Sequence, residues 1–195
     1  MLIGIGIVGM PGSGKSLLTD AAKNLGIPTI VMGDLVREET KKRGLDLTTE
    51  NVLSVAEDLR RKYGRKAVAI LVIRKIKEEN IMQKSDVVVI EGLRSPEEKD
   101  VFNDFFDRFV IVAVHASPRT RYKRMIERGR MDDTKSIEVM KKRDLKELAF
   151  GIAELLAMAD FHLVNENKEK GEFYKECIGL LKTIIEEVKG SDKAS

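Results

Sequence analysis

The sequence predicts an α/β fold in three layers, a five-stranded parallel sheet covered by helices on both faces. Apolar, strand-like runs alternate with amphipathic segments along all 195 residues, without repeats or low-complexity linkers. The run Asp86–Glu91 is rich in β-branched residues, as expected for a parallel strand buried on both faces. Alternating elements of this kind form a parallel sheet with right-handed crossovers, and such sheets bind ligands at the carboxyl ends of their strands.

The N-terminal part begins with two strand–helix pairs. The apolar run Leu2–Val8 predicts the first strand. Apolar residues at helical spacing predict a helix from Lys15 to about Leu25, which ends because Gly26 and Pro28 follow. The short strand Thr29–Met32 then leads through Gly33 into a helix that ends near Gly44.

The middle of the chain is expected to carry a helical insert at about 45–82. Its two helices are Thr49–Tyr63 and Arg65–Asn80, with apolar residues at helical spacing and no strand between them. After the strand Asp86–Glu91, the segment Ser95-Pro96-Glu97-Glu98 predicts a helix start with a capping box and proline at the first helical position.

The C-terminal part completes the alternation. Phe109–His115 is the fourth expected strand, and Ser117-Pro118 caps the helix that carries Arg119–Arg128. A polar stretch separates this helix from one long helix ending near Ala159. The last strand is Phe161–Asn165, and the last helix runs from about Gly171 to Lys189.

These elements predict one domain over residues 1–189. It contains the helical insert at about 45–82 and a short lid at about 128–135, and the small, polar residues 190–195 form a tail that frays.

The composition is that of a globular protein, with 43% hydrophobic and 34% charged residues. No apolar run is long enough to span a membrane, and the N-terminal run lacks the basic flank and cleavage site of a signal peptide. The net charge of +3 is too small to indicate nucleic acid binding by itself. The single cysteine, Cys177, excludes an intramolecular disulfide and fits a reducing cytosol, so we expect a cytoplasmic protein. Abundant Lys and Glu with one Gln are typical of thermophile proteins.

The strongest functional signal follows the first strand. The motif G-x-x-x-x-G-K-S is formed by Gly9, Met10, Pro11, Gly12, Ser13, Gly14, Lys15 and Ser16. A strand before it and an amphipathic helix after it are the context in which this motif is a phosphate-binding P-loop. Backbone N–H groups and the helix N-terminus would hold a nucleoside triphosphate, Lys15 would reach its β- and γ-phosphates, and Ser16 would ligate Mg²⁺.

Several P-loop classes lack their signatures here. The chain has no N-K-x-D, no D-x-x-G and no L-S-G-G-Q-type sequence. It is also too short for an oligomeric ATPase machine with a lid domain. These absences argue against switch GTPases and transport or motor ATPases and leave small-molecule kinases as the leading class.

Two strand ends resemble acceptor sites of such kinases. Met32–Arg37 resembles the T-G-D-x-x-R segment of adenylate kinases, where the Arg binds the acceptor nucleotide, and the D-x-x-A-R segment of dephospho-CoA kinases, where the Asp lies beside the accepting hydroxyl. The resemblance implies that Arg37 binds the acceptor and that Asp34 is a base or orienting group, although Asp34 could also be a helix N-cap.

The segment Val89–Arg94 resembles the D-G-x-P-R segment of nucleoside monophosphate kinases. It differs in having Glu for Asp and no proline. The resemblance implies that Glu91 holds Mg²⁺ through water and that Arg94 binds the acceptor phosphate. The alternative for Arg94 is a solvated loop position.

A third segment is rich in arginine. Arg121, Arg124 and Arg128 share one helical face, and Gly129 then breaks the helix before Arg130. This resembles the short lid of small P-loop kinases, and we expect Arg128 and Arg130 to stabilise the charge of the transferring phosphoryl group. The alternative is a solvated basic helix face.

Together these segments are similar to the nucleoside monophosphate kinase-like branch of P-loop proteins, which includes adenylate, cytidylate and dephospho-CoA kinases. The closest likeness is to uncharacterised archaeal proteins described as adenylate-kinase-related or dephospho-CoA-kinase-like, whose I-V-G-M-P-G-S-G-K-S, I-E-G-x-R-S and R-G-R-x-D-D strings recur here. The resemblance covers Met1 to Glu172 and implies an ATP- and Mg²⁺-dependent kinase with a nucleotide-like small-molecule acceptor.

Two other functions stay open at this point. One is a P-loop ATPase or switch that acts with a protein or RNA partner, and the other is a regulatory nucleotide-binding module without turnover. The sequence does not identify the acceptor or the oligomeric state. His115 closes one strand and His162 lies inside another, so we expect both to be structural rather than metal ligands.

Overall fold

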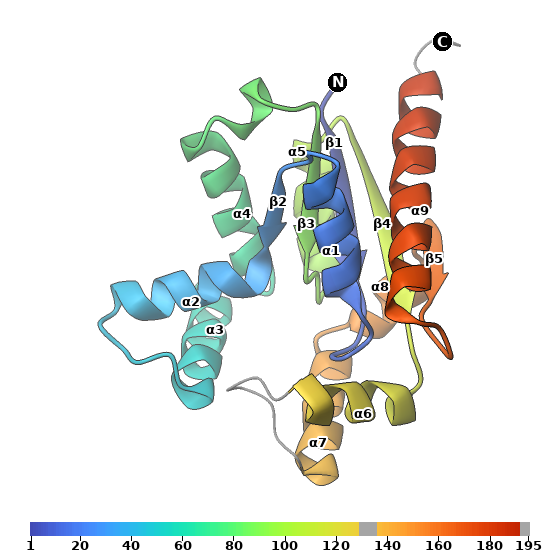
Figure 1. Cartoon of the computed structure of the whole chain (residues 1–195). Helices are drawn as coiled ribbons and strands as arrows, with labels where there is room; N and C mark the ends of the chain where they lie inside the picture. Colours follow the sequence, from blue (N-terminus) through green and yellow to red (C-terminus); the bar gives the residue numbers. More distant parts are fainter. Residues whose placement is uncertain (129–135, 192–195) are drawn as a thin grey trace.

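A parallel sheet forms the centre of the protein. The structure, a computed structural model, describes residues 1–128 and 136–191. It confirms the predicted fold: the five strands are ordered β2-β3-β1-β4-β5, and every neighbouring pair is parallel. Helices lie on both faces of the sheet (Figure 1). The strands are β1 (Ile3–Val8), β2 (Thr29–Val31), β3 (Val87–Glu91), β4 (Arg108–His115) and β5 (Phe161–Val164).

The alternating sequence of β1 determines what covers each face. Its three isoleucines pack with apolar residues of α1 (Lys15–Asn24) and α9 (Lys170–Ser191). Its glycines point the other way, because successive residues of a strand face opposite sides. A Cβ on Gly4 would lie 2.5 Å from the Phe109 ring. The ring therefore packs against the strand only because Gly4 has no side chain.

Other helices cover the second face of the sheet, on which Phe109 lies. Apolar residues of α4 (Ala67–Glu78), α5 (Pro96–Phe105) and α8 (Ile152–Ala157) pack there in one buried cluster with residues of the strands. Helices α2 (Met32–Lys42) and α3 (Thr49–Tyr63) pack against each other and against α4, and in Figure 1 they extend to one side of the sheet. The other elements are α6 (Pro118–Arg128), α7 (Ile137–Ala149) and the 3₁₀ turn Ile81–Gln83.

The register of the strands brings the predicted site residues to one edge. Glu91 at the end of β3 lies opposite Ile7 of β1 and Val31 of β2. The segment 9–16 that follows β1 therefore lies beside the residues that follow β2 and β3, as parallel pairing requires.

One expectation about the helices was wrong. The sequence predicts one long helix ending near Ala159, but the structure has α7 up to Ala149 and a separate α8 from Ile152. The break occurs because Gly151 has a φ of 100°, a left-handed conformation that interrupts the helix and favours glycine.

Two further differences concern the chain end and the lid. Helix α9 continues to Ser191, so Gly190 and Ser191, expected to belong to a fraying tail, are helical. Residues 129–135, where most of the predicted lid falls, lie outside the described residues. Among the described helices, none has the length and apolar character needed to cross a membrane.

Candidate functional site

The P-loop connects β1 to α1 and depends on glycine. Gly12 has a φ of 81° and Gly14 a φ of 101°, both in the left-handed region. A Cβ on Gly12 would lie 2.7 Å from the Arg121 carbonyl oxygen, and one on Gly14 would lie 2.2 Å from Nδ2 of Asn165. Both positions therefore require glycine, because the backbone is left-handed there and a side chain would collide with neighbouring atoms.

Two side chains from distant elements hold the loop. Arg121 Nη1 donates to the Pro11 carbonyl at 2.9 Å, and Asn165 Nδ2 donates to the Ser13 carbonyl at 2.9 Å. Both bonds fix loop carbonyls on the side of α6 and β5. This arrangement leaves loop N–H groups and the N-terminus of α1 for an anion, which is how helix N-termini bind phosphate.

Lys15 lies inside this loop. Its Nζ donates to the carbonyls of Gly9 at 2.7 Å and Met10 at 3.2 Å. Burial lowers the pKa of Lys15 to about 8, and the carboxylates of Glu91 and Glu147 act in the opposite direction. The ammonium is thus desolvated and poised for a strong interaction with an anionic ligand.

Ser16 and Glu91, the predicted metal ligands, line the same cavity. Thr19 Oγ1 donates to Glu91 Oε2 at 2.7 Å, which orients the carboxylate at the end of β3. The described part of the chain contains no cluster of three or more His, Cys, Asp or Glu side chains able to hold a metal. Ser16 and Glu91 together fit Mg²⁺, which is usually held by one or two protein oxygens together with phosphates and water.

Asp34 and Arg37, the predicted acceptor residues on α2, bind each other. Arg37 Nη1 lies 2.6 Å from Asp34 Oδ1, and both side chains are exposed. Asp34 is not the N-cap of its helix, because α2 begins at Met32 and Val31 occupies the cap position. Both residues line the cavity that contains the P-loop.

Arg94 is held by two buried carboxylates. Its Nη1 lies 3.4 Å from Glu147 Oε1, and its backbone N–H donates to Glu98 Oε2 at 2.8 Å. Ser95 Oγ accepts from the Glu98 N–H, so half of the predicted capping box forms, while the Glu98 carboxylate binds Arg94 instead of Ser95. Burial raises the pKa of Glu98 to about 7. Arg94 is therefore a fixed group of the cavity wall rather than a solvated loop residue.

The cavity has a volume of about 1140 Å³, slightly above the range of about 300–1,000 Å³ that is usual for small-molecule sites. The P-loop and Glu91 line one part of it, and α2 and α7 line others. On α7, Arg143 and Glu147 line the cavity. Sequence reasoning missed Glu147, because a polar residue on a helix gives no signal of the cavity it faces.

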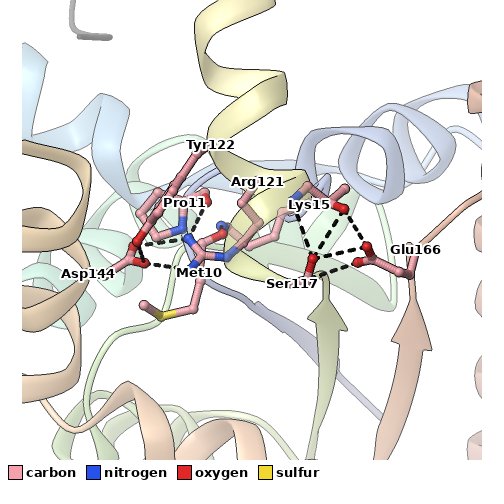
Figure 2. A network of polar contacts seen from close by, with 9 residues as sticks. Met10, Pro11, Lys15, Ser117, Arg121, Tyr122, Asp144 and Glu166 are labelled. Atoms are coloured by element: carbon pink, nitrogen blue, oxygen red, sulfur yellow. Dashed lines mark hydrogen bonds and ion pairs between the residues drawn. The ribbon is translucent and has the colours of Figure 1, made fainter. Parts of the chain in front are cut away.

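The predicted arginine face of α6 is divided between structural and cavity roles. Arg121 is 3% exposed and binds Asp144 with Nη1 at 3.0 Å and Nη2 at 2.5 Å, as Figure 2 shows. Arg124 lines the cavity, and its Nη2 donates to the Asn165 carbonyl at 3.0 Å. Arg121 is thus a link between α6, α7 and the P-loop, not part of a solvated face or lid.

The two arginines expected to contact phosphate are not placed by this geometry. Arg128 is the last residue of α6, and its side chain is outside the described part of the structure. Arg130 lies in 129–135, outside the described residues.

Glu166 fixes the connection after β5 to the start of α6. It accepts from the Ser117 N–H at 2.8 Å, from Ser117 Oγ at 3.0 Å and from Thr120 Oγ1 (Figure 2). The hydrogen bond from Thr120 lowers the pKa of Glu166. This anchoring holds the neighbouring Asn165 against the P-loop.

The two histidines, predicted separately, meet across β4 and β5. His115 Nε2 lies 3.1 Å from His162 Nδ1, and the rings are stacked. Burial, with a smaller effect of His162, lowers the pKa of His115.

Comparison with known proteins gives consistent matches. A family model described as an AAA domain matches residues 8–141. A UPF0200 protein of Methanocaldococcus jannaschii is 44% identical over 184 residues, which cover 94% of this chain and 89% of that protein. A UPF0200 protein of Thermococcus onnurineus is 45% identical over 183 residues, 93% of this chain and 97% of that protein. One of Hyperthermus butylicus is 46% identical over 178 residues, 91% of this chain and 92% of that protein.

Among solved structures, the crystal structure of TT1252 from Thermus thermophilus has a TM-score of 0.65 with 21% sequence identity. The match covers 95% of this chain and 97% of that one. At this identity the likeness concerns the fold.

Proposed function

The chain belongs to the UPF0200 family and carries the AAA domain of P-loop NTPases, and from this premise we propose that it is a small-molecule kinase. It transfers the γ-phosphoryl group of Mg-ATP to a nucleotide-like acceptor. The whole of residues 1–189 acts as one domain, in which the insert at about 45–82 closes over the acceptor.

One observation carries this proposal: the P-loop shares its cavity with arginine residues from three other parts of the fold. Arg37 on α2, Arg94 after β3 and Arg143 on α7 line the cavity beyond the phosphate-binding segment. A protein that only binds a triphosphate needs the P-loop and its metal. Additional guanidinium groups in the same cavity favour a second anionic ligand, because arginine binds carboxylates and phosphates with paired hydrogen bonds.

The P-loop residues each have a proposed role on the donor side. The backbone of 9–16 holds the phosphates and Lys15 neutralises the transferring group. Ser16 and Glu91 hold the metal, and their oxygen atoms are of the kind that Mg²⁺ prefers. When bound, Mg²⁺ would supply neutralisation of charge on the phosphate oxygens.

The acceptor and lid roles follow the resemblance of the sequence. Asp34, Arg37 and Arg94 are proposed to contact the acceptor, and Arg128 and Arg130 to complete the charge around the phosphoryl group. This electrostatic role is the main contribution that proteins make to phosphoryl transfer.

The test is ADP release from Mg-ATP with AMP, CMP, dCMP, UMP, GMP and dephospho-CoA as candidate acceptors. Lys15→Ala is expected to lower the rate by about 100-fold or more, because it removes a charge aimed at the transferring group. Lys182→Ala, at an exposed position of α9, is the matched control and should keep the wild-type rate. Full activity in Lys15→Ala would refute the assignment. A slow rate that no acceptor changes but that is lost in Lys15→Ala would favour an ATPase instead.

A further inference from the structure

Glu147 is a buried carboxylate of the cavity whose second oxygen lacks a partner. The residue is 6% exposed, on the part of α7 that lines the cavity. Arg94 lies 3.4 Å from Oε1, whereas Oε2 is buried and has no hydrogen-bond partner among the described residues. An unsatisfied buried carboxylate oxygen is unfavourable, so such an atom in a cavity wall indicates a ligand with a hydrogen-bond donor.

The surroundings of Glu147 place it toward the phosphate-binding part of the cavity. Arg94, Arg143 and Lys15 line the same cavity. The Glu147 carboxylate raises the pKa of Lys15, second only to Glu91 among the groups acting in that direction. Arg60 of α3, whose guanidinium lies 4.4 Å from the Phe150 ring centroid, also interacts electrostatically with Glu147. The Glu147 carboxylate thus acts electrostatically on the lysine that would bind the γ-phosphate.

The kind of acceptor decides whether a carboxylate is useful there. A monophosphate attacks with an oxygen that already carries negative charge, so it needs no base, and a nearby carboxylate repels it. A hydroxyl must lose its proton, and a carboxylate that accepts this proton is the usual solution in kinases with alcohol acceptors.

Asp34 is less suited to that task. Its Oδ1 accepts from Arg37 at 2.6 Å, and 58% of its side chain is exposed. Glu147 has the free oxygen, the burial and the neighbouring lysine together.

We propose that Glu147 is a catalytic residue whose Oε2 binds the attacking hydroxyl of the acceptor, so that the acceptor reacts as an alcohol and not as a phosphate. In the step, the hydroxyl oxygen forms a bond to the γ-phosphorus of the nucleoside triphosphate, and the bond from that phosphorus to the β–γ bridging oxygen breaks. The nucleoside diphosphate leaves, and the hydroxyl proton passes to Glu147. Arg94 holds the other carboxylate oxygen and so fixes the orientation. This inference rests on the proposed kinase function.

The experiment uses the full chain with Mg²⁺ and ATP labelled on the γ-phosphate. The hydroxyl probes are adenosine, cytidine, glycerol and dephospho-CoA, and the phosphate probes are AMP and CMP. Acid stability of the labelled product distinguishes a phosphate ester from an anhydride. The variants are Glu147→Gln, which keeps the side-chain volume, and Glu138→Gln, an exposed carboxylate on the same helix, as the control. Triphosphate affinity and thermal unfolding are measured for each.

We expect an acid-stable ester in the wild type. Glu147→Gln should lower kcat by about 100-fold or more, the usual contribution of a general base, while triphosphate affinity changes less than about threefold. A residue that only supports the fold would instead lower the unfolding temperature and the triphosphate affinity together with kcat. Glu138→Gln should behave as the wild type.

The remaining outcomes overturn the role of Glu147, either alone or together with the kinase function. An acid-labile anhydride on a monophosphate, formed equally well by Glu147→Gln, overturns the role of Glu147 and leaves the kinase function intact. If only inorganic phosphate is released with every probe, no acceptor is phosphorylated, and both the kinase function and the role of Glu147 toward an acceptor hydroxyl are overturned. Turnover that is absent, or that does not depend on Lys15, overturns both the kinase function and this inference.

Discussion

Replacing Glu98 with glutamine is expected to remove a pH-dependent loss of stability. Burial raises the pKa of Glu98 from 4.5 to about 7. Between these pH values the folded protein keeps a proton that the unfolded chain releases, so the free energy of unfolding falls as pH rises through this range. The shift of about 2.5 units corresponds to about 3 kcal/mol at about 1.4 kcal/mol per unit.

The effect is sizeable because burial outweighs the groups that stabilise the charged carboxylate. Glu98 is 1% exposed, and the Arg94 N–H at 2.8 Å offsets only part of the loss of hydration. Glutamine keeps an oxygen that accepts the same hydrogen bond but does not titrate. The stability of Glu98→Gln relative to the wild type should therefore rise by about 3 kcal/mol between pH 4 and pH 8.

Urea unfolding of the two proteins at steps of half a pH unit measures this difference. Asp100→Asn, at an exposed position of the same helix, is the matched control and should show a much smaller change with pH. A stability difference between Glu98→Gln and the wild type that stays constant within about 0.5 kcal/mol from pH 4 to pH 8 would show that Glu98 does not carry the raised pKa.

Two further substitutions test how the P-loop is supported. Asn165→Ala removes the bond to the Ser13 carbonyl and should weaken triphosphate binding, measured by calorimetry, about fivefold, since such a bond is worth about 1 kcal/mol. Unchanged affinity would mean that the loop keeps its shape without this contact. Arg121→Met leaves the buried Asp144 without its guanidinium and should reduce the free energy of unfolding by about 3 kcal/mol in a urea titration. Arg119→Met, on an exposed position of the same helix, should change it by less than about 0.5 kcal/mol, and an equal effect of the two would contradict the structural role of Arg121.

The sequence by itself determined the sheet and the phosphate-binding loop. The strand runs were recognisable because a strand buried on both faces is apolar along its buried length, as in the first four residues of β3. The P-loop was recognisable because its conformation depends on contiguous residues. Gly12 and Gly14 have left-handed backbones within the motif itself, so the sequence motif indicates the loop conformation directly. The family matches agree with both conclusions.

The tertiary structure alone decided which polar side chains belong to the cavity and which support it. Arg121 has the same sequence pattern as an exposed arginine, but Asp144 of another helix makes it a buried link. Asn165 reaches Ser13 across 152 positions of the chain. Gly151 separates α7 from α8, and a Cβ there would lie 2.9 Å from the Pro96 ring of a third helix.

Glu147 shows the physical reason most clearly. Helical periodicity reports how often apolar residues recur on one helix face, and it contains no information about what a polar residue of that helix meets. Whether a carboxylate is solvated, paired or left with an unsatisfied oxygen depends on groups brought together from α1, β3 and α7 by the packed fold. A motif whose conformation depends on a few contiguous residues can be predicted from the sequence, whereas a site formed by packing of distant elements cannot.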